Sequence, residues 1–511
     1  MKNTFKVMFS RIFIVASLIT LQVVGLIYAF IRLSYLFAYI HAGFLVLGIL
    51  SMLWIISRNE NTSYKLAWVI AVLGLPVGGV ILFLIFGKSN LSKEFRIKTE
   101  DIYNKTIKFL KQDDSIREEI RQMDMNVAKQ SEYITRTSAF PIYKNTFTQY
   151  LSPGEVKFEK IIEELKKAKH YIFIEYFIIE EGFMWDSVLD ILIKKVREGV
   201  DVRVIYDDFG CICKLPHHYD EKLRELGIKC VVFNPVTPVV TVRHNTRDHR
   251  KILVIDGHTG FTGGINLADE YINRVERFGH WKDASIMLKG DAVWSLTVMF
   301  LQTWNFYNNF IEDYDNYRPE KFKVEEIESD GYVQPYGDSP LDNERLGEFT
   351  YLNMINRAKD YIYINTPYFI VDNEITTALE LAAKSGVDVR IVTPCVPDKW
   401  YVHILTRSYY EQLISVGVKI YEYTPGFIHS KTFVCDDELG VVGTINLDFR
   451  SLYFHFECGI WLYKTKSVME IKEDFLKTLD VCHEVTLEEC RNVKWYIRII
   501  RSFLRVFAPL M

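Results

Sequence analysis

The chain has 511 residues, and its 61 lysines and arginines nearly balance its 65 aspartates and glutamates, so the formal net charge is −4. A balance this close to neutral disfavours a protein that binds nucleic acid through a broad basic surface. Charged residues at 25% and hydrophobic residues at 49% exclude a largely disordered chain. The eight cysteines contain no C-x-x-C pair, which argues against a disulfide framework or a zinc site.

Three long apolar stretches without aspartate, glutamate, lysine or arginine open the chain. They cover Ile12–Ile31, Leu33–Ser57 and Leu66–Gly87, and glycine and proline interrupt the last one. About 20 apolar residues, each rising about 1.5 Å along a helix, cross the roughly 30 Å hydrocarbon core of a bilayer. We therefore predict a membrane anchor of two or three hydrophobic helices over residues 1–88, and a multi-pass location in the cell (plasma) membrane.

The topology of this anchor stays open, because positive residues flank every apolar stretch. The positive-inside rule places both the N-terminus and the segment after Gly87 on the inner side, which three full spans cannot achieve. Either the first stretch lies on the membrane, or one stretch is re-entrant, or the rule fails here. The charge-rich residues 89–138 that follow predict a polar helical linker.

From residue 139 onward the sequence contains two related units. The string Gly-Val-Asp-Val-Arg at 199–203 recurs at 386–390, and each copy follows a helical stretch and then a β-branched and aromatic run. Such alternation of helix and strand predicts two α/β domains with mostly parallel core sheets. We place the first domain at 139–320 and the second at 321–490.

Each unit carries the same motif, H-x-K-x4-D-x6-G-(G/T)-x-N. The motif residues are His249, Lys251, Asp256 and Asn266 in the first unit and His429, Lys431, Asp436 and Asn446 in the second. Side chains two positions apart on a strand share a face, so each histidine lies beside its lysine. Two such units together provide imidazole, ammonium and amide groups around a phosphate-sized pocket, and this pocket needs no metal or cofactor.

Two histidines in one phosphate pocket predict a transfer in two steps. One imidazole attacks phosphorus to form a phosphohistidine, while the other protonates the leaving alkoxide and later deprotonates the incoming hydroxyl. Each ring needs a carboxylate on its other nitrogen, and Asp283 and Glu457 are the candidates further along the chain. Asp256 and Asp436 either belong to the catalytic set or hold the turns that follow the two strands.

These motifs resemble the phospholipase D superfamily, whose signature is two H-x-K-x4-D copies, and within it the bacterial cardiolipin synthases. The closer likeness rests on the strings RDHRKILVIDG (247–257), FTGGINLADEY (261–271), HWKD (280–283) and TINLDFRS (444–451). It implies two tandem phospholipase D-like α/β/α domains that form one active site and follow N-terminal transmembrane helices. The first apolar stretch is additional to the family's usual pair, and Asp248 and His455 stand where asparagine is common.

The resemblance implies a membrane-bound phosphatidyltransferase that converts two phosphatidylglycerol molecules to cardiolipin and glycerol through a phosphatidyl-histidine intermediate. It also implies His249 as the nucleophile and His429 as the acid and base, an order that the residues alone do not decide. A phospholipase D-type phosphodiesterase with water as acceptor carries the same motifs and is the alternative. A nuclease of the superfamily fits the near-neutral charge less well. We expect anionic membrane lipid as partner, and no nucleic acid.

Residues 491–511 predict a basic amphipathic helix at the end of the chain. The basic residues recur at intervals of three and four and therefore share one helical face: Arg491, Lys494, Arg498, Arg501 and Arg505. Such a helix suits the surface of an anionic bilayer, where each basic residue adds about 1 kcal/mol. The alternative is a helix that packs on the domain and leaves its basic face in water.

Overall fold

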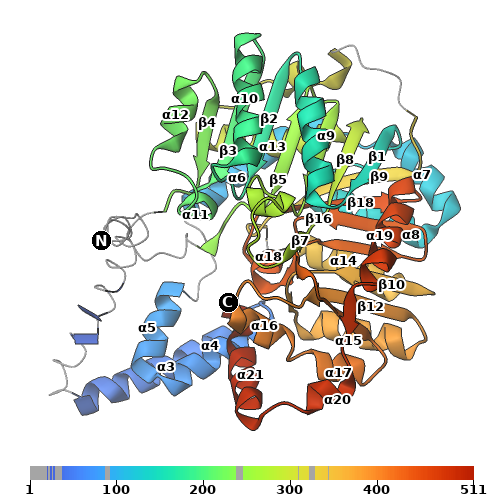
Figure 1. Cartoon of the computed structure of the whole chain (residues 1–511). Helices are drawn as coiled ribbons and strands as arrows, with labels where there is room; N and C mark the ends of the chain where they lie inside the picture. The colour runs from blue at the N-terminus through green and yellow to red at the C-terminus, as the bar shows by residue number, and fades with distance from the viewer. Residues whose placement is uncertain are drawn as a thin grey trace.

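Two neighbouring β-sheets with helices around them form the body of the protein (Figure 1). The computed structural model describes residues 37–86, 93–236, 245–308, 310–321, 328–342 and 344–510, together with a few isolated positions before residue 37. Every strand of the first sheet lies before residue 291, and every strand of the second lies after residue 331. The fold is therefore α/β, and each of the two sequence repeats builds a sheet of its own.

Seven strands form the first sheet, in the order β1-β8-β6-β5-β2-β3-β4. They are β1 (Thr146–Leu151), β2 (Tyr171–Tyr176), β3 (Asp201–Asp207), β4 (Lys229–Phe233), β5 (Lys251–Ile255), β6 (Thr259–Gly263) and β8 (Ser285–Gly290). Strands β2, β3 and β4 are parallel, whereas the other neighbouring pairs are antiparallel. The expectation of a mostly parallel sheet is therefore wrong. The turn after β5 is too short for a crossover, so β6 returns as an antiparallel hairpin partner.

Eight strands form the second sheet, in the order β19-β13-β12-β10-β15-β16-β18-β9. They are β9 (Tyr332–Asp338), β10 (Tyr361–Asn365), β12 (Asp388–Pro394), β13 (Lys419–Tyr423), β15 (Thr432–Cys435), β16 (Leu439–Gly443), β18 (Glu457–Tyr463) and β19 (Cys482–Glu484). Its parallel part is again the set that contains the repeated string, β10, β12 and β13. The two sheets thus share one plan.

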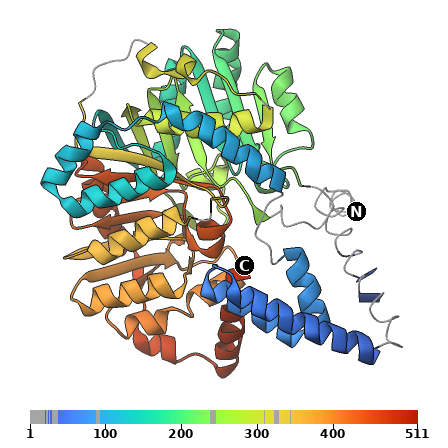
Figure 2. The same ribbon diagram turned by 180° about the vertical axis from the view of Figure 1, so that it is seen from behind.

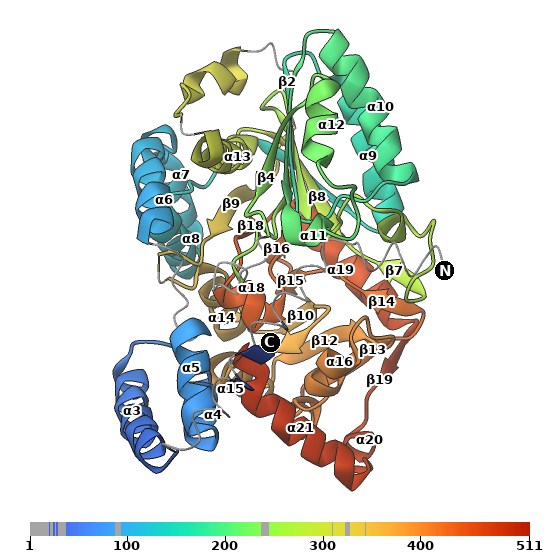
Figure 3. The same ribbon diagram turned by 90° about the vertical axis from the view of Figure 1, so that its left-hand side faces the viewer.

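Helices cover both faces of each sheet (Figure 3). The first sheet packs against α9 (Gly154–Lys167), α10 (Phe183–Arg197) and α12 (Tyr219–Glu225) on one face and against α13 (Val293–Asn308) on the other. The second sheet packs against α14 (Leu346–Arg357), α15 (Asn373–Lys384) and α17 (Tyr410–Ile414) on one face and α19 (Lys466–Leu479) on the other. Shorter helices are α11 (Asp208–Cys211), α16 (Trp400–Thr406), α18 (Phe449–Tyr453) and α20 (Leu487–Arg491).

One apolar core joins the two domains. Helices α13 and α19 and the facing sides of both sheets contribute to it, with Phe173, Val298, Val434 and Phe475 among its buried residues. A shared core resists separation of the domains, because exposing its apolar surface to water would cost about 25 cal/mol of free energy per Å². The two motif-bearing strands are therefore held at a fixed distance from each other.

Three helices precede the first sheet: α6 (Lys93–Thr106), α7 (Asp114–Met123) and α8 (Met125–Ser138). Helix α6 packs on α13, and α8 packs on α14 and β9, so this segment runs along both domains on the side seen in Figure 2. The amide of Gln130 on α8 donates to the carbonyl of Thr350 on α14. These helices add a further connection between the two halves.

The N-terminal apolar region forms α3 (Phe37–Ser57), α4 (Thr62–Gly74) and α5 (Pro76–Phe86), which pack on one another. The stretch at 66–87 breaks at Leu75, because Pro76 lacks an N–H group and disfavours helical geometry in the residue before it. In the part of the chain that the structure describes, no helix is both long and apolar enough to span a membrane. The stretch at 12–31 lies outside the described residues apart from isolated positions. The predicted transmembrane helices are thus not confirmed.

The C-terminal residues form helix α21 (Trp495–Phe507), and the structure shows which of its side chains contact the second domain. Two of the predicted basic residues contact the second domain: Arg491, the last residue of α20, pairs with Glu411, and Arg505 of α21 lies over the ring of Tyr409. Its exposed side chains include the apolar Trp495, Tyr496, Ile499, Ile500 and Phe503. The helix therefore turns a large apolar face outward, rather than only a basic one.

Candidate active site

The two histidine–lysine pairs lie at the start of equivalent strands, β5 and β15. His249 precedes β5, whose first residue is Lys251, and His429 and Lys431 precede β15. All four residues are buried. The two pairs meet at one centre, since the ammonium group of Lys431 in the second domain lowers the pKa of His249 in the first. The structure therefore brings residues of both motifs near one another, as a joint site requires.

His429 obtains its carboxylate partner from the first domain. The short strands β7 (His280–Lys282) and β14 (Gly426–Ile428) pair in parallel across the interface and end directly before Asp283 and His429. The backbone N–H of His429 donates to the carbonyl of Lys282 at 2.7 Å. This pairing brings Nδ1 of His429 to 2.7 Å from Oδ2 of Asp283.

His249 obtains its partner from the second domain by an equivalent route. An isolated parallel bridge joins Asp248 to Phe456, and the backbone N–H of His249 donates to the carbonyl of Phe456 at 2.9 Å. Nδ1 of His249 then lies 2.9 Å from Oε1 of Glu457. Each histidine is therefore oriented by a carboxylate of the opposite domain. We predicted the two carboxylates from the sequence, but not this crossed pairing.

The Glu457 carboxylate accepts hydrogen bonds from side chains that sequence reasoning missed. The hydroxyl groups of Thr444 and Ser451 donate to it, the latter at 2.7 Å. Burial raises the pKa of Glu457 to about 8, and the charge of Lys251 and the two hydroxyls lower it only in part. Thr444 occupies the G/T position of the second motif and Ser451 follows the motif, and a neutral hydroxyl at either place gives no signal of this role in a sequence.

Asp283 lies in a different environment. It accepts the backbone N–H of Ala284 at 2.8 Å. Burial acts to raise its pKa, but the positive charges of His429 and Lys431 outweigh it, so the pKa of Asp283 is lowered. Three aromatic rings surround His429 with centroids 5.3 to 5.9 Å away, namely Trp281, Tyr271 and Phe427.

Burial sets the charge states of the four motif side chains. It lowers the pKa of His429 to about 4 and that of His249 well below its usual range, and the neighbouring lysines add to both effects. Burial also lowers the pKa of Lys251 to about 8 and that of Lys431 to about 7. Each lysine donates one hydrogen bond to the carbonyl of the histidine two positions before it. Two further N–H groups on each lysine remain for an anion.

The two motif asparagines have different surroundings. Asn266 accepts the backbone N–H of Ile178 at 3.0 Å and donates to the hydroxyl of Tyr271 at 2.8 Å, so it positions one of the rings around His429. Asn446 is buried, and its side-chain oxygen has no hydrogen-bond partner among the described residues. Its side chain contacts Asp448. Both asparagines remain candidates for orienting the site.

The motif aspartates lie at the other end of the strands, away from the histidines. Asp256 accepts the backbone N–H groups of residues 169–171 at 2.8 Å each, and Asp436 accepts those of 359–361 at 2.9 to 3.1 Å. Both have positive φ, near 50°, at the turn that follows the strand. These contacts favour the structural alternative over a place in the catalytic set, because each aspartate ties its turn to the start of a neighbouring strand.

One group of potential metal ligands exists in the described part of the chain, formed by His249, His455 and Glu457. Their ligand atoms lie within 4.8 Å of one another. However, Glu457 already accepts the histidine and two hydroxyl groups, and the charge of Lys251 acts on the same carboxylate. Cation binding there would face repulsion and lose these hydrogen bonds, so the residues do not fit a resident metal.

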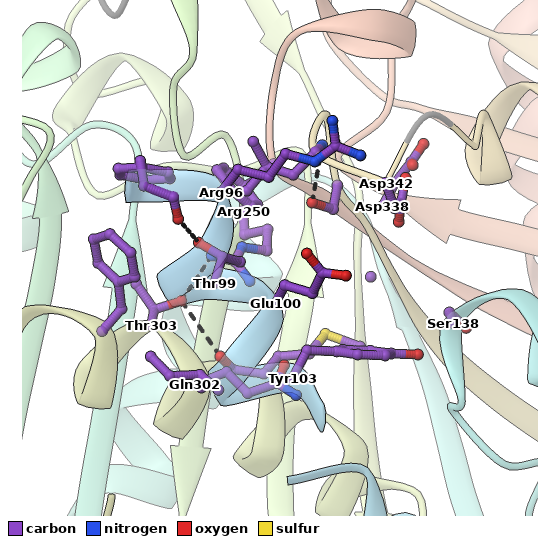
Figure 4. A pocket seen from close by; sticks show the side chains of 18 of the residues that line it. Arg96, Thr99, Glu100, Tyr103, Ser138, Arg250, Gln302, Thr303, Asp338 and Asp342 are labelled. Carbon is purple, nitrogen blue, oxygen red and sulfur yellow. Dashed lines mark hydrogen bonds between the residues drawn. The ribbon is translucent and has the colours of Figure 1, made fainter. Parts of the chain in front are cut away.

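A cavity of about 340 Å³, whose lining includes neither His249 nor His429, lies beside the first motif. Figure 4 shows Arg250 among the residues that line it. Its lining includes Arg250 and Phe456, the chain neighbours of His249 and Glu457, together with residues of α6, α13 and β9. Because successive side chains of an extended segment point to opposite faces, Arg250 points away from the motif pair. Arg250 binds Asp248 and Glu175 in buried ion pairs and so anchors the motif from behind.

Comparison with known proteins agrees with these features. The family described as "Cardiolipin synthase, PLD-like domain" matches residues 161–281 and 351–479, and "Phospholipase_D-nuclease N-terminal" matches residues 46–88. Among solved structures, the phosphatidylserine synthase of Haemophilus influenzae is similar in fold, with a TM-score of 0.55 and 15% sequence identity. That likeness covers 75% of this chain and 98% of the synthase.

Relatives with higher identity cover most of the chain. An uncharacterized protein of Streptococcus mutans is 44% identical over 90% of this chain and 99% of its own length. The cardiolipin synthase of Alkalihalophilus pseudofirmus is 34% identical over 94% of this chain and 98% of its own length. Cardiolipin synthase 2 of Bacillus anthracis is 35% identical, over 89% and 88%. The chain therefore belongs to the phospholipase D-like cardiolipin synthase family.

Proposed function

We propose that the protein is a membrane-bound phosphatidyltransferase that makes cardiolipin and glycerol from two phosphatidylglycerol molecules. The observation that carries this proposal is the single buried centre with two histidines, each paired with a carboxylate of the opposite domain and each beside a lysine. This centre combines a nucleophile, an acid and two cations, which are the groups that transfer of a phosphodiester requires. The family relationship supplies the identity of the lipid.

In the first step, Nε2 of His249 attacks phosphorus, and the bond from phosphorus to the glycerol oxygen breaks. His429 gives its proton to that oxygen, and free glycerol leaves. The asymmetry between the carboxylates supports this division of roles. A lowered pKa keeps Asp283 ionised beside His429 and favours an imidazolium there, while the raised pKa of Glu457 leaves His249 the more neutral ring.

The bound phosphodiester completes the charge balance of the site. Its negative charge raises the pKa of His429 and of both lysines, which burial lowers in the free protein. Lys251 and Lys431 then stabilise the charge that develops on the phosphoryl oxygens. The product of this step is a phosphatidyl group bonded to Nε2 of His249.

In the second step, a hydroxyl of the second phosphatidylglycerol attacks the same phosphorus. Neutral His429 takes the hydroxyl proton, the phosphorus–nitrogen bond breaks, and His249 leaves as neutral imidazole. The product carries two phosphatidyl groups on one glycerol. Water in place of the second lipid would give phosphatidic acid, so the acceptor decides between a transferase and a hydrolase.

Membrane attachment is a part of the proposal that rests on exposed apolar surface. Helix α21 exposes Trp495 by 74%, Ile499 by 59% and Phe503 by 64%, and these residues follow one another at intervals of four. Helix α4, which also exposes apolar residues, contacts α21. We place both surfaces against an anionic bilayer in the cell membrane, where basic residues beside them face lipid phosphates.

The test incubates the purified full-length protein with phosphatidylglycerol liposomes, with a chelator present, and measures the lipids by mass spectrometry. Cardiolipin with an equal amount of glycerol supports the proposal. Phosphatidic acid with glycerol contradicts it in favour of a hydrolase, and unchanged phosphatidylglycerol contradicts the substrate. The control is His249→Ala under the same conditions, for which no product is expected.

A further inference from the structure

A third histidine lies at the catalytic centre without an assigned role. The ring centroid of His455 is 5.7 Å from that of His249, and its side chain is only 11% exposed. Neither of its ring nitrogens has a hydrogen-bond partner among the described residues. Buried polar atoms in folded proteins nearly always have a partner, so this pair of orphaned nitrogens points to a ligand that completes them.

The protein groups nearest to His455 do not satisfy it. Nδ1 of His455 lies 3.8 Å from Oε1 of Glu457, which is beyond hydrogen-bond distance, and that oxygen already accepts from His249 and Ser451. A metal ion is disfavoured there by the neighbouring Lys251, as described above. A group that brings its own acceptor oxygen and a negative charge fits this place better.

The equivalent position in the first domain strengthens the inference. His455 stands two residues before Glu457, and Trp281 stands two residues before Asp283. The carboxylate of each domain orients one catalytic histidine, and the ring two residues before that carboxylate packs on the same histidine. The ring centroids are 5.3 Å apart for Trp281 and His429 and 5.7 Å apart for His455 and His249. The repeat thus places one ring on each side of the centre, and only the ring beside His249 is an imidazole.

We propose that His455 is a further catalytic residue, which donates a hydrogen bond from its ring N–H to a non-bridging phosphoryl oxygen of the bound lipid. The ring stays neutral, since burial together with the neighbouring His249 and Arg450 lowers its pKa well below the usual value. A neutral imidazole always keeps one N–H donor. Charge on the phosphoryl oxygens increases as the histidine attacks, so this hydrogen bond strengthens in the transition state.

This role rests on the proposed phosphoryl chemistry but not on the identity of the acceptor. The same oxygen is present whether a lipid hydroxyl or water attacks, so the proposal applies to a transferase and to a hydrolase alike. It requires no new covalent step, because His455 keeps its proton throughout. Lys251 and Lys431 supply charge to the phosphate, and His455 adds a directed donor on the side of the nucleophile.

Three variants test the proposal. His455→Phe keeps a flat ring and removes both nitrogens, whereas His455→Asn keeps an N–H donor. His403→Asn serves as a matched control, because His403 is a partly buried histidine on α16, outside the centre. The first readout is kcat/KM for consumption of phosphatidylglycerol in liposomes. The second is the inhibition constant of orthovanadate, a phosphate mimic, measured with thermal melting of each variant.

We expect His455→Phe to lower kcat/KM by about 10²- to 10³-fold, the usual effect of losing one transition-state donor. Vanadate inhibition should weaken at least tenfold, with an unchanged melting temperature. His455→Asn should recover most of both losses, and His403→Asn should match the wild type.

Either of two results overturns the proposal: near-normal turnover in His455→Phe, or an equal loss in His455→Asn, which would assign the effect to ring packing. Vanadate binding can also be followed directly by calorimetry, without lipid turnover. Failure of the proposed lipid reaction therefore remains distinguishable from failure of this inference.

Discussion

The two histidine–carboxylate pairs have the same geometry but different surroundings. In both, Nδ1 of a histidine meets a carboxylate of the other domain, at 2.9 Å for His249 and Glu457 and at 2.7 Å for His429 and Asp283. Burial dominates around Glu457 and raises its pKa to about 8, whereas positive charge dominates around Asp283 and lowers its pKa.

This difference explains how the two copies of a duplicated motif can have different roles. The repeat supplies two copies of the same nucleophile and cation, so the motif alone treats the two histidines as equal. The copies differ at one position inside the motif, where Thr444 stands against Gly264. The other residues that distinguish them lie outside the motif: His455 on one side, and Trp281 and Tyr271 on the other. The different roles of the two histidines therefore depend on the residues that surround each of them.

The largest expected effect comes from removing either histidine. His249→Ala and His429→Ala should each lower kcat by about 10⁴- to 10⁶-fold, because residues that act as a unit fail together. The two variants should differ in the intermediate: intact-protein mass spectrometry should find no lipid adduct in His249→Ala and a persistent adduct in His429→Ala. An adduct that forms in His249→Ala but not in His429→Ala would reverse the assigned roles.

The crossed carboxylates give the next effect and test the pairing itself. Glu457→Gln and Asp283→Asn should each reduce kcat by about 10²- to 10⁴-fold, since an amide holds the wrong imidazole tautomer. Rapid-quench measurement should find slower adduct formation in Glu457→Gln and slower adduct breakdown in Asp283→Asn. If each variant instead slowed the step of the histidine in its own domain, the pairing would not be crossed in solution.

The lysines predict an alkaline limit to activity. Their pKa values are lowered to about 7 for Lys431 and about 8 for Lys251. Each ammonium group keeps its positive charge below its pKa and loses it as the pH rises through that value. We expect kcat/KM to fall above about pH 7 to 8. The fall in kcat should occur at a higher pH than the fall in kcat/KM, because the bound phosphate raises the pKa values of both lysines.

Substitution by arginine checks the source of this limit. Lys431→Arg should lower activity at neutral pH, because the guanidinium has a different shape, but it should move the alkaline fall of kcat/KM upward. Lys251→Arg provides the matched comparison in the other half. A profile that keeps its alkaline limb in both variants would assign the limb to a different group.

The turn aspartates give the smallest effect on catalysis. Asp256→Asn and Asp436→Asn each weaken three hydrogen bonds to backbone N–H groups and should destabilise the fold by about 1–2 kcal/mol. Activity of the folded protein should stay within about threefold of the wild type, since neither side chain reaches the centre. Chemical denaturation and kcat at low temperature separate these outcomes, and a selective loss of kcat would return these residues to the catalytic set.

Much of the site was predictable because it follows local rules. The repeat of H-x-K with a downstream asparagine predicted His249, Lys251, His429 and Lys431, since a two-residue spacing places side chains on one face of a strand. Asp283 and Glu457 followed from the need of each imidazole for a carboxylate. Thr444 and Ser451 were missed, because a buried hydroxyl that supports a carboxylate looks like any other serine or threonine in a sequence.

The membrane region illustrates a different limit. Composition predicted apolar helices, and the described residues do form α3, α4 and α5. Whether such helices cross, enter or lie on a bilayer depends on their length after breaks such as that at Leu75 and on what they pack against. Helix α21 shows the same point, since its basic residues partly contact the second domain and its apolar face points outward.

By itself, the sequence determined the chemistry of this protein: two imidazoles, two ammonium groups and two carboxylates, delivered by two copies of one α/β unit. Tertiary structure decided which carboxylate serves which histidine, because that depends on the pairing of β7 with β14 and of Asp248 with Phe456 across the interface. It also placed Asp256 and Asp436 at the turns, where they accept backbone hydrogen bonds, and His455 beside His249. Residue types and short spacings are local properties, whereas partners and electrostatic environment come from contacts between distant segments, such as His249 and Glu457, which are 208 residues apart.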